Sequence, residues 1–143
     1  MSYDAEPVSE DIIQWLEAQR RWVGSFYPAE HRHLFDTVDG KLEVLAVILK
    51  NKWYQPEDDW KLEALGVALG DALIQQMNMH WVILGDDSGK SLAVELEGND
   101  AAKSIFVHPI GMIEKRLNRD ESIDVKELFH GVCDAVKLRV AGS

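Results

Sequence analysis

The sequence has a single cysteine, no long apolar run and no excess of positive charge. Because Cys133 stands alone, neither an intramolecular disulfide nor a cysteine-rich zinc site can form within the chain. The apolar runs are only a few residues long, far short of the ~20 that span a bilayer, so a membrane is not expected as a partner. The first residues lack the basic start and apolar stretch of a secretory signal, and we therefore expect a cytoplasmic protein.

The charge balance is strongly acidic. Lys and Arg number 15 against 25 Asp and Glu, which gives a formal net charge of -10. This charge repels the phosphate backbone that dominates nucleic-acid affinity, so DNA and RNA are not expected as partners. It favours a basic protein partner, although an acidic surface also keeps many proteins soluble.

The length and composition indicate one packed domain. A chain of 143 residues with 46% hydrophobic residues and five Trp can bury a single stable core. We expect residues 1–8 to form a flexible leader and residues 9–140 to form a single α+β domain. Whether the domain is a monomer or a homodimer stays open.

Apolar residues at helical spacing predict a helical N-terminal half. Ser9 can cap a first helix that ends at Gly24. A short helix follows through Phe35, and another helix is expected over residues 41–50.

A longer helix is predicted from Pro56 to Met77, because proline suits a first helical turn and acidic residues follow it. This helix contains Gly66 and Gly70, one turn apart. Glycine costs ~1 kcal/mol of helix propensity relative to alanine. Its presence at both positions therefore indicates that another element approaches closely, and we interpret this as packing of the helix on a sheet.

Three strand-like segments come next, at residues 80–84, 90–96 and 104–108, with a glycine-rich turn between the first two. Alternation over residues 91–96 predicts a sheet with one solvent-facing side and one side packed on helices. Two helices should follow, the last of them capped by Asp124. The predicted fold is thus α+β, with a helical N-terminal half, a small three-stranded antiparallel sheet and C-terminal helices.

The order of several short segments is also distinctive: Leu65–Asp71, Met79–Val82, Asp87–Gly89 and Phe106–Ile113. In this order the sequence resembles the bacterial family catalogued as domain of unknown function 3806. The resemblance implies a helical half joined to a small antiparallel sheet. It implies no activity, since none is assigned to the family.

No catalytic constellation stands out, and we assign neither catalytic residues nor a cofactor. His31 and His33 supply at most two ligands, and their spacing points them apart on a helix, so no metal site is predicted.

Two groups of residues are candidate binding sites. In the first group, aromatic residues flank an acidic segment, a composition that resembles protein interfaces. The alternative interpretation is that these aromatic side chains pack into the core. This group comprises Trp53, Tyr54, Asp58, Asp59 and Trp60. The second group is a ligand pocket between sheet and helix, formed by Asp71, Trp81 and His108.

Three functions are consistent with these features. The first is a non-enzymatic interaction or accessory domain that binds a basic protein. The second is an immunity protein that neutralises a secreted toxin, and the third is a small enzyme or ligand-binding module with a pocket near Trp81 and His108.

Overall fold

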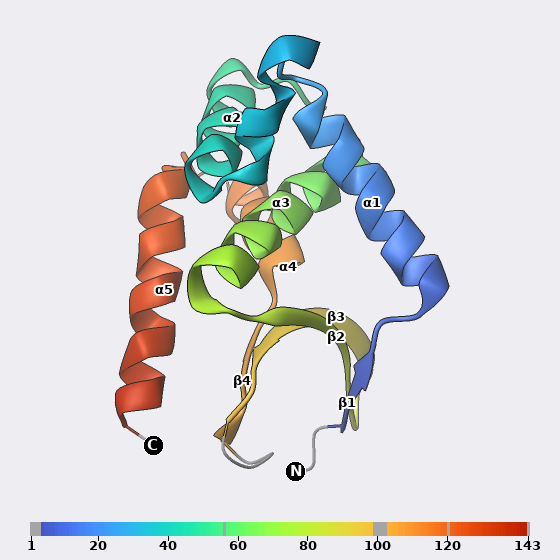
Figure 1. The fold of residues 1–143 in the computed structure, drawn as a ribbon, viewed down its shortest axis with the longest axis vertical. Coiled ribbons are helices and arrows are strands. Elements are labelled where there is room, and N and C mark those ends of the chain that lie inside the picture. Colours follow the sequence, from blue (N-terminus) through green and yellow to red (C-terminus); the bar gives the residue numbers. More distant parts are fainter. Residues whose placement is uncertain (1–3, 56, 99–102, 120, 143) are drawn as a thin grey trace.

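The computed structural model describes residues 4–55, 57–98, 103–119 and 121–142, and it has an α+β fold. The elements in chain order are β1 (Asp4–Pro7), α1 (Glu10–Gly24), the 3-10 helix η1 (Ala29–Asp36), α2 (Val38–Asn51), α3 (Asp59–Met77), β2 (His80–Asp86), β3 (Gly89–Leu96), β4 (Ile105–Val107), α4 (Pro109–Asn118) and α5 (Val125–Ala141). Figure 1 shows α3 at the centre of the helical layer, with the curved sheet below it. In the part of the chain covered by these ranges, no helix is both long and apolar enough to cross a bilayer.

Side-chain caps fix the starts of several helices. Ser9 Oγ accepts a hydrogen bond from the Ile12 amide at 3.4 Å, and Asp124 accepts one from the Glu127 amide at 3.1 Å, which confirms both predicted caps. Helix α2 begins three residues earlier than expected because Thr37 caps it. Pro56, the predicted start of the long helix, lies outside the described residues.

Helix α3 is buried on nearly all sides, and its two glycines lie at close contacts with other elements. A Cβ atom on Gly66 would lie 2.4 Å from Ile110 Cα in α4. On Gly70 it would lie 2.5 Å from the Trp81 ring of β2 and 2.9 Å from Pro109 Cγ. The predicted close approach is therefore present, although only Gly70 faces the sheet and Gly66 packs against a helix.

The sheet has four antiparallel strands in the order β1-β2-β3-β4, so the predicted number of three is corrected to four. The additional strand is β1, which falls within the segment expected as a flexible leader. Its four residues pair in register with Val82–Gly85. All four are exposed, so backbone hydrogen bonds rather than apolar burial hold this edge strand in place. The sequence therefore contains no hydrophobic pattern that predicts the strand.

The two faces of the sheet both carry apolar residues. Trp81 and Val94 face the helices and join the main core. The opposite face was expected to be polar, yet Val82, Leu84 and the fully buried Ala93 form a second, smaller cluster there with Phe106. The expectation was wrong because it treated one strand alone, whereas the apolar neighbours of Ala93 come from the strands on either side.

Candidate functional site

The tryptophans of the predicted protein-binding group belong to a larger aromatic cluster on the molecular surface. Trp22 of α1 makes edge-to-face contacts with Phe26 and Trp60, at ring-centre distances of 5.2 Å and 5.3 Å. Phe26 stacks on Trp53 at 5.3 Å. Trp53 and Trp60 are 46% and 47% exposed, so the cluster is only partly covered. We call Trp22, Phe26, Trp53 and Trp60 the aromatic surface.

Other members of the predicted group have structural contacts. Tyr54 is half-buried against the core, and burial raises the pKa of its phenol. Asp58 accepts a hydrogen bond from the Gln55 amide at 3.3 Å and forms an ion pair with Lys61 at 3.0 Å. The Lys61 ammonium also lies 5.6 Å from the centre of the Trp60 ring, within the range of cation–π attraction.

An acidic strip begins beside Trp60 on α3 and includes one residue of α4. We use this name for Asp59, Glu63 and Glu114. Burial raises the pKa of Glu63, and the negative charges of Glu114 and Asp59 raise it further. Among the residues that the structure describes, none of the three carboxylates forms an ion pair. The strip is therefore a site of unrelieved negative charge.

Replacing Glu63 with glutamine is expected to stabilise the protein slightly near neutral pH. The folded protein holds the Glu63 proton more tightly than the unfolded chain does, so the contribution of this group to stability falls as pH rises through the raised pKa. The variant lacks that penalty. Because the residue is only partly buried and solvent screens its charge, we expect a gain of at most about 0.5 kcal/mol in thermal unfolding near neutral pH, and no gain at about pH 4. An equal gain at both pH values would contradict the electrostatic explanation.

The predicted ligand-pocket residues Asp71 and Trp81 lie in direct contact. The Trp81 indole Nε1 donates a hydrogen bond to Asp71 Oδ1 at 3.0 Å. Arg20 of α1 binds the same carboxylate with two donors, Nε at 2.6 Å and Nη2 at 3.0 Å. The hydrogen bonds that Arg20 donates to Asp71 raise the pKa of Arg20, while burial opposes the rise. Asp71 is thus a buried anchor that joins α1, α3 and β2.

A cleft of about 620 Å³ opens beside this anchor, between α1, η1, α2 and α3. Lys41 extends into it and donates hydrogen bonds to the Phe35 carbonyl at 2.8 Å and to the Gln75 side chain. Burial lowers the pKa of Lys41, against the opposing charges of Asp71 and Asp36. Cations and carboxylates both line this cleft, and Arg20 pairs with Asp71 and Glu17, so part of its charge is compensated internally.

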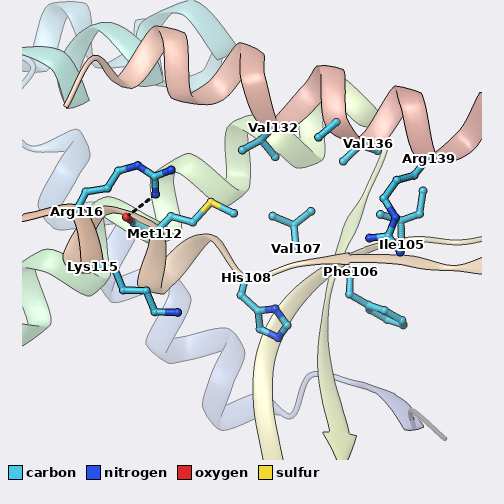
Figure 2. Close-up of a pocket in the computed structure, with 11 residues that line it drawn as sticks. Ile105, Phe106, Val107, His108, Met112, Lys115, Arg116, Val132, Val136 and Arg139 are labelled. Atoms are coloured by element: carbon cyan, nitrogen blue, oxygen red, sulfur yellow. Dashed lines mark hydrogen bonds between the residues drawn. The ribbon is translucent and has the colours of Figure 1, made fainter. Parts of the chain in front are cut away.

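His108 does not join Asp71 and Trp81. It is exposed after β4, where its Nε2 lies 3.3 Å from Ser91 Oγ. It lines a separate cleft of about 460 Å³ between β4, α4 and α5 (Figure 2). The three predicted residues therefore belong to two different places in the molecule.

The structure places His31 and His33 on the exposed surface of η1. A different group, not considered from the sequence, brings His80 Nε2 to 3.1 Å from Glu95 Oε1 and 3.7 Å from Glu97 Oε1. Among the described residues, the ligand atoms of His80, Glu95 and Glu97 lie close enough together to hold a metal ion. His80 and Glu95 face each other across β2 and β3, a relationship that only the strand register reveals.

The fold and its surface define a small α+β domain built around α3. Comparison with known families then identifies it. A family model described as "Domain of unknown function (DUF3806)" matches residues 41–129, more than half of the chain, so the protein belongs to this family. None of the curated proteins matches the sequence.

The fold is also similar to a crystal structure from Bacteroides thetaiotaomicron VPI-5482, with a TM-score of 0.70 and 15% sequence identity. The similarity covers 94% of this chain and 48% of that protein, so the chain spans about half of its length. At this identity the likeness concerns the fold alone.

Sequence reasoning missed Arg20, Trp22 and Phe26. Arg20 lies 51 residues from its partner Asp71, and no local pattern links the two. Trp22 and Phe26 have helical spacing. Their four-residue separation next to a helix end was the available signal for an aromatic pair.

Proposed function

We propose that the protein is a non-enzymatic, cytoplasmic interaction domain that binds a basic protein through the aromatic surface and the acidic strip. The observation that carries this proposal is the partial exposure of Trp53 and Trp60 within one contiguous aromatic cluster. Tryptophan is enriched among the residues that contribute most to protein-protein affinity, since it buries a large apolar area with few rotatable bonds.

The charge beside the aromatic surface favours a basic partner. Lys61 already lies over the faces of Trp60 and Trp22, so these rings accept a cation within the chain itself. Arginine or lysine side chains of a partner could make the same contact with Trp53 and pair with Asp59 and the rest of the acidic strip. Such pairing would also relieve the repulsion that raises the pKa of Glu63.

Replacing Trp60 with alanine is expected to weaken partner binding by at least tenfold, because truncation of a central interface tryptophan commonly costs about 2 kcal/mol or more. The partner is first captured from an extract of the native host by the full-length chain and identified by mass spectrometry. Its affinity for wild-type and variant proteins is then measured by titration calorimetry. The matched control is Leu138→Ala, since Leu138 is 74% exposed on α5, away from the aromatic surface.

The charge contribution is tested with Asp59→Lys, which leaves the internal Asp58–Lys61 pair intact. We expect weaker binding and a smaller dependence of affinity on salt concentration. Unchanged affinity in both Trp60→Ala and Asp59→Lys would exclude this face as the binding site. If the partner proves to be a secreted basic toxin, the domain acts as an immunity protein, which is the second function considered from the sequence.

The third candidate function is a small enzyme or ligand-binding module. The predicted pocket supports it only weakly. Asp71 is engaged by Arg20 and Trp81, and His108 lies elsewhere. A separate cleft lined by three cations lies between β4, α4 and α5.

A further inference from the structure

The cleft between β4 and α5 has an apolar floor. Figure 2 shows Val107 and Met112 on one side of the space, with Val132 and Val136 of α5 opposite them. His108 and Phe106 point away from α5 on the other side of the strand. The floor is therefore formed by branched and flexible apolar side chains, which is the usual composition of small-molecule sites.

The polar residues that line the cleft carry charge of one sign. Lys115, Arg116 and Arg139 line it together with His108, and no carboxylate of the described residues does so. Figure 2 places Arg116 at one end of the apolar floor and Arg139 at the other. This composition is unusual in a chain that holds 25 Asp and Glu against 15 Lys and Arg.

In the described part of the chain, the three cations have no carboxylate partner. Among the described residues, Arg116 donates a hydrogen bond to the Met112 carbonyl at 3.1 Å, and a guanidinium carries five N–H donors in all. Within the ranges that the structure describes, neither Lys115, Arg116 nor Arg139 forms an ion pair. The larger cleft beside Asp71 differs in this respect, because its Arg20 pairs with Asp71 and Glu17, two carboxylates that line the same cleft.

We propose that the β4–α5 cleft binds a small amphipathic carboxylate, with an apolar tail on the valine floor and its anionic group held by Arg116 or Arg139. A guanidinium can bind a carboxylate with two parallel hydrogen bonds, which fixes orientation as well as charge. This site is separate from the aromatic surface, and the proposal does not depend on the function proposed above.

Two features favour a small molecule over an extended peptide added to the sheet edge. Strand β4 has only three residues, which offers a peptide few backbone partners. The volume of about 460 Å³ falls within the ~300–1,000 Å³ typical of sites for small ligands.

The test uses octanoate as the probe, with 1-octanol as the match for its chain and acetate as the match for its charge. The full-length ¹⁵N-labelled protein is titrated with each compound, and amide chemical shifts are followed by NMR. We expect octanoate to shift the amides of residues 105–112 and 132–139 saturably. We expect 1-octanol and acetate to bind at least tenfold more weakly, because each supplies only half of the recognised chemistry.

Two variants locate the site. Arg139→Gln should weaken octanoate binding by roughly threefold to tenfold, since it removes a charge-assisted hydrogen bond from an exposed side chain. Ala135→Trp places a large side chain into the cleft from an exposed position and should abolish binding. Lys137→Gln on the same helix makes the same change of charge outside the lining and should leave the affinity unchanged.

Absence of saturable shifts with octanoate would overturn the proposal, as would equal binding of octanoate and 1-octanol. Shifts confined to residues 53–63 would assign octanoate to the aromatic surface and overturn it equally. Saturable binding of a capped acidic peptide in place of octanoate would replace the proposal with strand addition at β4.

Discussion

Replacing Gly66 with alanine is expected to lower the stability of the fold by about 2–3 kcal/mol, even though alanine is the better helix former. The added methyl group would lie 2.4 Å from Ile110 Cα and 2.7 Å from the Ile110 carbonyl oxygen. Both are backbone atoms of α4, so no side-chain rotation relieves the contact, and α3 and α4 must move apart. In thermal unfolding this corresponds to a melting temperature lower by roughly 5–10 °C.

The matched control is Gly131→Ala in α5. A Cβ atom at Gly131 would meet no heavy atom within 4 Å, so this substitution tests helix propensity without crowding. It should stabilise the protein by about 0.5–1 kcal/mol. If Gly66→Ala had the same stabilising effect, the close packing of α3 against α4 would be refuted.

Replacing Asp71 with alanine is expected to cost about 3 kcal/mol of unfolding free energy, because it removes one side of a partly buried ion pair. Arg20 would lose two hydrogen bonds, and the indole Nε1 of the buried Trp81 would lose its acceptor. The loss should appear in chemical denaturation as a lower midpoint with an unchanged slope.

Glu17→Ala provides the comparison for this effect. Glu17 also pairs with Arg20, at 3.3 Å, but its side chain is 54% exposed. Water and salt screen such a pair, and we expect a change within about 0.5 kcal/mol. Equal effects of Asp71→Ala and Glu17→Ala would show that the burial of Asp71 has no energetic importance.

Local chemistry made part of this fold predictable from the sequence. The caps at Ser9 and Asp124 act within a few residues of themselves, and the structure confirms both. The glycine pair of α3 predicted a close approach, which the structure shows, but Gly66 packs against α4 and not against the sheet. Strand β1 was not predictable, because its partner lies more than 70 residues away and its own side chains are exposed. Its pairing depends on backbone groups that every sequence possesses.

The same reasoning explains the outcome for the candidate sites. Half of the aromatic surface was predictable, because Trp53 and Trp60 flank an acidic segment of the chain. Trp22 and Phe26 were not predictable, because they come from the end of another helix. The Asp71 anchor required knowledge that α1 crosses α3 at Arg20. Prediction of the β4–α5 cleft would have required the arrangement of α4 and α5 and the position of β4, and residue spacing encodes neither.

The composition of β1 has a consequence for behaviour at high concentration. Open strand edges readily recruit strands from other molecules and so begin aggregation. On this edge Pro7 has no amide hydrogen to donate, and Asp4 and Glu6 would bring like charges together if two copies met there. We therefore expect the N-terminal strand to disfavour edge-to-edge pairing between copies of the protein.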